Sequence, residues 1–287
     1  MKIFANAEVE TLFVAGNELG EGAFWDGARQ RLLWVDILQR QVLVQQGSDF
    51  ARYTLPVMPS VIWKVVKGQV YLATDQGVGV LDLADGSYRT VVEVEAHEPE
   101  TRSNDGGVSS DGSFWFGTMR HEPTHNGGAI YRVAPDLSVT RMHDAVGIPN
   151  TFLFPSGHDH ALIGDSFQRC IYRYAITDGR LGAREVWMEK GDNDVGTPDG
   201  SALICDSMVI NAEWGGGRIV AYDMTGRERG ALSLPVSFPT SCALGGQDGR
   251  TLFVTSAREG LTDEDLARQP NAGTVFSVKL PELPDAR

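Results

Sequence analysis

The sequence contains few cysteines, relatively little positive charge and no long apolar run. Only three of its 287 residues are cysteine and none form a C-x-x-C pair, which indicates a reducing cytoplasm and no thiolate zinc site. Its 25 Lys and Arg residues are outnumbered by 38 Asp and Glu residues, so the formal net charge is −13. This acidic balance argues against nucleic acid and anionic membranes as partners. No stretch approaches the ~20 apolar residues of a membrane span, and the N-terminal segment turns acidic too early for a secretory signal.

Long helical periodicity is also nearly absent. One capping-box-like start at Thr262 predicts a single short helix over residues 262–268. Glycine, in contrast, is abundant, with 33 residues. The Asp-Gly dipeptide favours tight turns, because both of its residues tolerate positive φ, and runs of strand length lie between its copies. It occurs seven times, starting at residues 26, 85, 105, 111, 178, 199 and 248.

A set of short strands recurs six times along the chain, at intervals of about 44 residues, which is the length of a β-propeller blade. The clearest strand of each unit lies at residues 32–37, 69–74, 113–118, 160–165, 207–212 and 250–255. These units predict an all-β, six-bladed β-propeller with four-stranded blades; a sandwich or a β-helix is the alternative. The sixth unit lacks an outer strand, so residues 8–14 are predicted to complete that blade and close the ring. With no linker, residues 1–287 are predicted to form a single domain.

One polar residue occupies an equivalent position in every unit, just before the innermost strand. The innermost strands of a propeller line its central channel, so these six side chains are expected to converge on one mouth. They are Glu21, Ser60, Asn104, Asn150, Asp199 and Thr240. Three of them carry the hard oxygen donors that divalent cations take, and two buried carboxylates without a cation would be costly. The alternative is that they are ordinary turn residues, since Asp and Asn before Gly are common in β-turns.

Several segments resemble the SMP-30/gluconolactonase/regucalcin-like family of sugar lactonases, and the resemblance covers nearly the whole chain. The most specific segment is R-x-N-D-G followed by F-W-x-G-T-M within residues 102–119, and the others lie at 18–25, 147–150, 197–202, 213–219 and 245–258. The resemblance implies a six-bladed propeller that binds one divalent metal ion. It also implies a carboxylic ester hydrolase of carbohydrate catabolism, which converts an aldonolactone to the aldonic acid.

The resemblance assigns roles to six residues. It implies Glu21, Asn150 and Asp199 as metal ligands, and calcium, zinc, manganese, magnesium and iron(II) all suit two carboxylates and an amide. It implies that the substrate binds to Arg102, Asn104 and Glu122. Asp199 is also the candidate catalytic residue, which orients or deprotonates the attacking water. The expected partner is a small neutral sugar lactone, bound by a monomer or a weak homo-oligomer.

The sequence departs from the family pattern at a few positions. Thr151 stands where the family usually has glycine, and it is expected to narrow the pocket beside the metal. Residues 205–207 replace an Asp-x-Glu-Gly turn, and Cys205 and Cys242 are predicted to be small buried residues of inner strands. Two other function classes are also compatible with the sequence. One is another metal-assisted hydrolase such as an organophosphate esterase, and the other is a non-catalytic propeller that binds a cation or senses a sugar.

Overall fold

The chain is nearly all β. The computed structural model describes residues 3–156 and 159–281, which contain 24 strands and one short helix. The strands form six four-stranded antiparallel sheets, so the prediction of a six-bladed β-propeller is confirmed. The chain divides into two compact units, one formed by Met1–Arg52 with Asn193–Arg287 and the other by Tyr53–Asp192. The single domain inferred from the sequence stays a prediction.

The unit formed by Tyr53–Asp192 holds three sheets, and in each the strands are ordered as in the chain. The first sheet contains β6 (Pro59–Val66), β7 (Gln69–Thr74), β8 (Gly77–Asp82) and β9 (Tyr88–Glu93). The second contains β10 (Thr101–Val108), β11 (Phe114–Arg120), β12 (Gly128–Val133) and β13 (Val139–Val146). The third contains β14 (Pro149–Leu153), β15 (His160–Asp165), β16 (Cys170–Thr177) and β17 (Arg180–Glu189).

The other unit holds the remaining three sheets, apart from the last two residues of β5. One sheet contains β2 (Gly20–Asp26), β3 (Arg31–Asp36), β4 (Gln41–Gln46) and β5 (Asp49–Thr54). The next contains β18 (Thr197–Ile204), β19 (Met208–Trp214), β20 (Arg218–Asp223) and β21 (Glu228–Ser233). The last contains β22 (Pro239–Gly245), β23 (Thr251–Ser256), β24 (Val275–Lys279) and, as its outer strand, β1 (Val9–Phe13).

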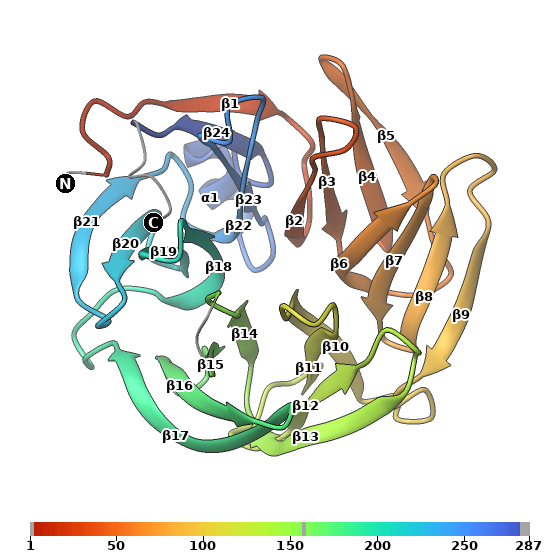
Figure 1. Ribbon diagram of the computed structural model, residues 1–287. Helices are drawn as coiled ribbons and strands as arrows, with labels where there is room; N and C mark the ends of the chain where they lie inside the picture. Colours follow the sequence, from red (N-terminus) through yellow and green to blue (C-terminus); the bar gives the residue numbers. More distant parts are fainter. Residues whose placement is uncertain (1–2, 157–158, 282–287) are drawn as a thin grey trace. The chain divides into compact units, whose positions relative to one another are not determined.

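The outer strand β1 comes from the opposite end of the chain to the rest of its sheet. It pairs antiparallel with β24, as Figure 1 shows, and Val9 lies opposite Val278. The prediction that the N-terminal strand completes the sixth blade is therefore confirmed. The helix α1 (Asp263–Arg268) is confirmed as well. Its N-cap is Thr262, whose side chain forms a reciprocal capping box with Asp265.

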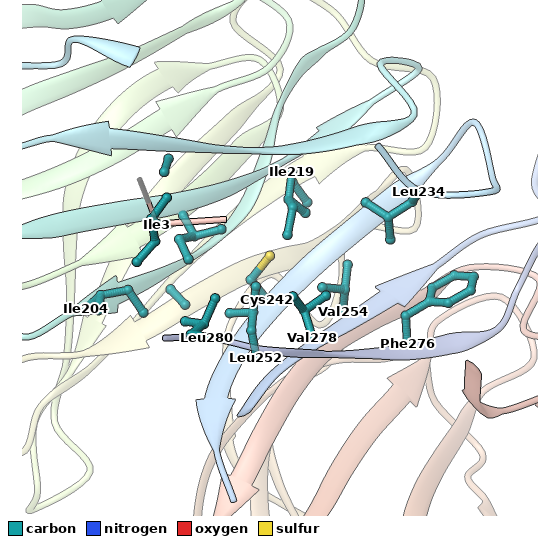
Figure 2. Packing of buried hydrophobic residues seen from close by; sticks show 14 of the residues in the cluster. Ile3, Ile204, Ile219, Leu234, Cys242, Leu252, Val254, Phe276, Val278 and Leu280 are labelled. Atoms are coloured by element: carbon teal, nitrogen blue, oxygen red, sulfur yellow. The ribbon is translucent and has the colours of Figure 1, made fainter. Parts of the chain in front are cut away.

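The position of a strand within its sheet accounts for its composition. The second strands are buried almost throughout, as in β3, whose residues after Arg31 are all buried. The outer strands β5, β9 and β21 have no fully buried residue, because one face of each lies in solvent. Between the β18–β21 sheet and the β22–β24 sheet, apolar side chains from both form one cluster that includes Ile204, Ile219, Val254 and Phe276 (Figure 2). Burying each such side chain contributes about 1.5–3 kcal/mol.

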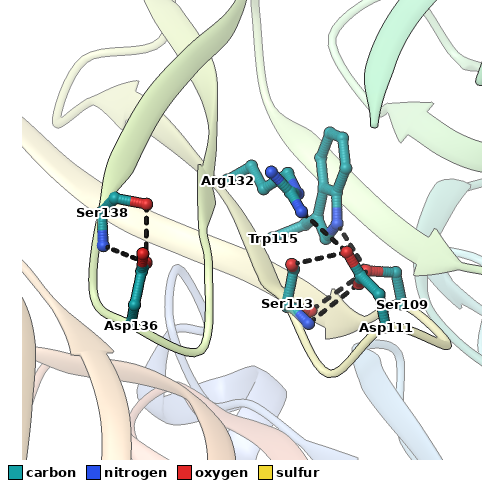
Figure 3. A network of polar contacts seen from close by, with 7 residues as sticks. All are labelled: Ser109, Asp111, Ser113, Trp115, Arg132, Asp136 and Ser138. Carbon is teal, nitrogen blue, oxygen red and sulfur yellow. Dashed lines mark hydrogen bonds and ion pairs between the residues drawn. The ribbon is translucent and has the colours of Figure 1, made fainter. Parts of the chain in front are cut away.

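Aspartates cap many of the turns between strands. In the turn before β11, the carboxylate of Asp111 accepts hydrogen bonds from Ser109 Oγ at 2.6 Å and from the amide and hydroxyl of Ser113 at 3.0 and 2.9 Å (Figure 3). It also pairs with Arg132 at 2.7 Å. Partial burial raises the pKa of Asp111, but these hydrogen bonds outweigh it and hold the pKa well below its usual range. Asp136 makes the same kind of turn with the serine two residues after it.

Candidate functional site

Every innermost strand has a break in its pairing register at the position of the predicted polar residue. The breaks lie between Glu21 and Phe24, Pro59 and Val61, Ser103 and Gly106, Asn150 and Phe152, Pro198 and Ser201, and Pro239 and Cys242. A β-bulge bends a strand and re-aims a side chain, and bulges are common next to active sites. The six polar residues therefore lie inside the inner strands, which corrects the prediction that they precede them. All six are buried, with at most 8% of their surface exposed.

Two of the seven Asp-Gly dipeptides belong to these bulges. Asp105-Gly106 lies within β10 and Asp199-Gly200 lies within β18, so neither forms the tight turn expected from the dipeptide. Both glycines allow a neighbouring strand to approach closely: Gly106 faces β11 of its own sheet, and Gly200 faces the inner strand β22. A Cβ atom on Gly200 would come within 2.8 Å of Ser241 Cα in β22. The dipeptide at these two places therefore serves strand contact, not chain reversal.

In the Tyr53–Asp192 unit, three predicted site residues form one buried hydrogen-bonded chain. Arg102 donates from Nη1 to Asn104 Oδ1 at 2.7 Å. Asn104 donates from Nδ2 to Asn150 Oδ1 at 3.0 Å and to the Pro149 carbonyl oxygen at 3.0 Å. Asn150 in turn donates from Nδ2 to Ser166 Oγ at 2.7 Å. The structure thus brings a predicted metal ligand into contact with the predicted substrate-binding pair.

The chemistry of the two ends of this chain determines the orientation of both amides. A guanidinium has only donors, so Asn104 must turn its oxygen towards Arg102. The Pro149 carbonyl has only acceptors, so the amide nitrogen of Asn104 must face it, and the same nitrogen meets Asn150. Asn150 must then present its oxygen to Asn104 and its nitrogen to Ser166. One lone pair of Asn150 Oδ1 accepts the bond from Asn104, and the second lone pair is suited to a cation.

Asp105, next to Asn104 in β10, supports the backbone beside Asn150. Its carboxylate accepts a hydrogen bond from the Thr151 amide at 2.8 Å. Thr151 is completely buried and has a φ of 54°, which is unusual for a β-branched residue. Burial raises the pKa of Asp105 to about 6, and the backbone amides of Gly106 and Thr151 oppose this rise. Asp105 therefore holds a strained backbone conformation at the residue that follows Asn150.

The two predicted carboxylate ligands lie in the other unit. Glu21 in β2 is 6% exposed and Asp199 in β18 is 4% exposed. Burial raises the pKa of the Cys242 thiol in β22, and the negative charges of Asp199 and Glu21 raise it further. The backbone around Asp199 is held by Asn211 of β19, whose Nδ2 donates to the Asp199 carbonyl oxygen at 2.8 Å. Both carboxylates therefore contribute negative potential at the buried thiol of Cys242.

The comparisons with known proteins assign the chain to a family. The sequence profile of the SMP-30/Gluconolactonase/LRE-like region matches residues 19–258. The chain belongs to this family.

Its relatives in the SMP-30/gluconolactonase family align over nearly their whole length. The L-arabinolactonase of Azospirillum brasilense is 35% identical over 270 residues, which cover 91% of this chain and 88% of that protein. The 6-deoxy-6-sulfogluconolactonase of Pseudomonas putida is 30% identical over 265 residues, with 91% of each chain covered. The crystal structure of a calcium-binding protein, regucalcin, from Agrobacterium tumefaciens superposes with a TM-score of 0.90 at 30% identity, over 98% of this chain and 97% of that one.

The departures from the family pattern have structural counterparts. Thr151 takes up the left-handed conformation that the usual family glycine adopts more easily. Cys205 and Asp206 form the turn between β18 and β19, with φ of 47° and 51°, and the Ser207 amide donates to the Ile204 carbonyl oxygen. The prediction that Cys205 lies in an inner strand is therefore wrong, because the strand ends at Ile204 and the half-buried Cys205 begins the turn. Cys242 does lie buried in an inner strand.

The remaining predicted site residue, Glu122, is not a member of the hydrogen-bonded chain. It is exposed in the loop between β11 and β12, together with His121 and His125. The His125 ring contacts Phe167, with ring centroids 6.1 Å apart. The structure therefore joins Arg102 and Asn104 of the predicted substrate-binding set and leaves Glu122 on an exposed loop.

Sequence reasoning missed the residues that hold the site in place. Ser166 and Asn211 bond to the predicted site residues Asn150 and Asp199, and Asp105 bonds to the backbone beside Asn150; none of the three was predicted. Asp105 lies inside the R-x-N-D-G segment, so its position was a signal that could have been used. Ser166 and Asn211 gave no such sequence signal, since a serine after a strand and an asparagine within a strand are common.

In residues 3–156 and 159–281, no group of three or more His, Cys, Asp or Glu side chains is placed to hold a metal ion. The predicted ligand set contains only two such residues, Glu21 and Asp199, because its third member is an amide. Over the same part of the chain, no helix has the length and apolar character needed to cross a membrane.

Proposed function

We propose that this protein is a metal-dependent sugar lactonase that hydrolyses an aldonolactone to the aldonic acid. Membership of the SMP-30/gluconolactonase family and the lactonase names of its relatives support the reaction class. The observation that carries the proposal is the bulge in every inner strand, which places a buried polar residue at the same position of all six blades. Bulges are over-represented next to active sites, where they re-aim side chains, so a bulge at the same position of all six inner strands supports a shared site there.

The proposed cation ligands are Glu21, Asn150 and Asp199. The donor set fits a divalent cation, because it consists of two carboxylates and an amide oxygen. Two observations support this fit. Asn150 turns its oxygen, not its nitrogen, towards Asn104. Glu21 and Asp199 are both buried, and two buried carboxylates are costly without a compensating positive charge. Calcium, zinc, manganese, magnesium and iron(II) all suit these ligands, and the Agrobacterium regucalcin is described as calcium-binding.

When bound, the cation supplies positive charge that polarises the lactone carbonyl. Asp199 is the proposed catalytic residue: its carboxylate orients the attacking water and takes up a proton from it. The water oxygen bonds to the carbonyl carbon, and the bond between that carbon and the ring oxygen breaks. The proton held by Asp199 ends on the ring oxygen as the new hydroxyl. The product is an open-chain hydroxy acid, so all atoms of lactone and water are accounted for.

Arg102 and Asn104 are proposed to hold the sugar hydroxyls, and Glu122 to contact them from its loop. The two amide hydrogens of Asn104 are already donated to Pro149 and Asn150, so Asn104 offers the substrate only an acceptor. Arg102 offers only donors. The pair therefore recognises one hydroxyl as a donor and another as an acceptor, which makes binding sensitive to sugar stereochemistry.

The chain as a whole suits a small neutral substrate in a reducing compartment. Its net charge of −13 does not oppose the approach of a neutral lactone, and it repels the anionic product. Cys170, Cys205 and Cys242 are free thiols. We therefore place the protein in the cytoplasm. We also propose that it is a monomer or a weak homo-oligomer.

A pH-stat assay tests the proposal. Acid release is followed for a panel of aldonolactones, with the protein as prepared, after treatment with chelator, and after each divalent cation is added back. Glu21→Gln keeps an oxygen but loses the charge of a proposed ligand. Glu93→Gln makes the same chemical change on the exposed outer strand β9 and is the matched control.

The expected result is hydrolysis that chelator abolishes, that a cation restores, and that falls in Glu21→Gln but not in Glu93→Gln. Full activity in metal-free protein with chelator present would rule out the role of the cation. Cation binding without hydrolysis of any lactone would indicate a non-catalytic propeller. Hydrolysis of organophosphates in preference to lactones would indicate the other class of hydrolase.

A further inference from the structure

The hydrogen-bonded chain from Arg102 to Ser166 has a single direction. Each member donates to the next: Arg102 to Asn104, Asn104 to Asn150, and Asn150 to Ser166, with distances of 2.7, 3.0 and 2.7 Å. All four residues are buried, with at most 9% of their surface exposed. In such surroundings, reversing one amide leaves donors facing donors and oxygens facing oxygens, at a cost of about 1–3 kcal/mol for each buried group left without a partner.

We propose that this directed chain is a positioning device that determines which atom of Asn150 is offered to a cation, and that Ser166 is its terminal positioning residue. The proposal rests on the proposed function, because it takes Asn150 as a cation ligand. An asparagine amide has two ends of nearly equal size and opposite polarity. Only the oxygen can ligate a cation, so the amide must be held in one of two orientations. Arg102 determines that orientation from one end, and Ser166 accepts the amide hydrogen at the other.

The direction of the chain predicts opposite effects for two identical chemical changes. Asn104→Asp keeps the acceptor for Arg102 but replaces the donor that faces Asn150 by an oxygen. Asn150 must then turn its nitrogen towards residue 104, and its oxygen moves to Ser166, whose hydroxyl can donate. Cation affinity therefore falls, although the substitution adds negative charge. Asn150→Asp keeps an accepting oxygen at Asn104, and the Ser166 hydroxyl can donate to the other oxygen, so affinity is kept or rises.

Ser166 can be tested separately, because a carboxylate is symmetric and needs no orientation. Ser166→Ala leaves the Asn150 amide hydrogen without its acceptor and weakens the preference for one orientation. In an Asn150→Asp background the two oxygens are equivalent, so reversal has no consequence. The effect of Ser166→Ala on cation affinity should therefore be large with asparagine at position 150 and small with aspartate. A purely structural role would give the same effect in both backgrounds.

The experiment is calorimetric titration of metal-free, full-length protein with calcium and with manganese, at alkaline pH where an introduced carboxyl is ionised. The variants are Asn104→Asp, Asn150→Asp, Ser166→Ala and the double variant Ser166→Ala with Asn150→Asp. Urea unfolding in chelator checks that each variant is folded. We expect roughly tenfold weaker binding for Asn104→Asp and for Ser166→Ala, and at most about a threefold further change when Ser166→Ala is added to Asn150→Asp.

The outcomes separate this inference from the proposed function. Binding by the wild type, with equal or tighter binding by Asn104→Asp, overturns the positioning role and leaves the cation site standing. An equal effect of Ser166→Ala in both backgrounds overturns the role of Ser166. No cation binding by the wild type contradicts the proposed function itself, and the inference with it. If Ser166→Ala does not fold, the pair Asn104→Asp and Asn150→Asp still decides.

Discussion

Asp105 offers a direct test of how the inner strands are held together. Its carboxylate is buried in β10, accepts the Thr151 amide at 2.8 Å, and has a pKa raised to about 6 by burial. The ordinary aspartate value is 3.8, so the folded state holds a proton that the unfolded chain has already released between these two values. The free energy of unfolding must therefore fall as the pH rises through this window, and this contribution levels off above it.

The size of the effect follows from the shift. A rise of about two pKa units corresponds to about 3 kcal/mol of stability that is present at low pH and lost by neutral pH. Asp105→Asn cannot ionise, so this contribution to the pH dependence should be missing from the variant. The carboxylate of Asp105 has two backbone amide partners, Gly106 and Thr151. The variant keeps an accepting oxygen for only one of them and turns its NH₂ group towards the other, which costs about 1–3 kcal/mol at every pH. Because that cost does not vary with pH, the two effects can be separated.

The assay is equilibrium urea unfolding of wild type and Asp105→Asn, in chelator, at a series of pH values from about pH 4 to about pH 8. The difference in unfolding free energy between the two proteins should change by up to about 3 kcal/mol across the window and be flat above it. All other titrating groups are shared, so they cancel in the difference. A difference that stays constant with pH would show that Asp105 does not have a raised pKa in the folded protein.

Three further predictions concern stability. Because Thr151 has a φ of 54°, Thr151→Gly should be more stable than Thr151→Ala by about 1 kcal/mol in urea unfolding, whereas the reverse order is expected in an extended strand. Cys205→Asn with Asp206→Gly puts the preferred pair into a turn whose two residues have positive φ, so the melting temperature should rise. Asp111→Asn should lower the free energy of unfolding at neutral pH by about 1 kcal/mol, discounted for its exposure. Because the pKa of Asp111 is lowered, this difference should begin to shrink as the pH falls below about 4 and should disappear only at still lower pH.

Much of the fold could be predicted from the sequence because it depends on local patterns. Strand-length apolar runs, turn residues and the spacing of about 44 residues are all properties of contiguous segments. The strand pattern of residues 8–14 and the missing outer strand of the last unit together predicted β1. The capping box at Thr262 predicted α1 for the same reason, since a cap involves residues three apart.

The candidate site could be predicted only as a list of positions. The repeat register picked out Glu21, Asn150 and Asp199, and the structure shows that each lies at a bulge. The bulges themselves were not predicted, because a bulge is defined by two residues on one strand opposing one on its partner. The sequence-based interpretation of Asp105-Gly106 as a turn failed for this reason, since the dipeptide tolerates both structures.

The sequence by itself determined the number of blades, the strands that build them and the polar residue at the inner position of each blade. These properties follow from hydrophobic alternation and turn chemistry, which act over a few residues. Only the tertiary structure decided that Asn104 meets Asn150, 46 residues further along the chain, and that Asn150 meets Ser166. The orientation of the two amides depends on those contacts, because an isolated asparagine has no preference between its oxygen and its nitrogen. Partners brought together by folding supply that preference, with Arg102 donating at one end and Ser166 accepting at the other.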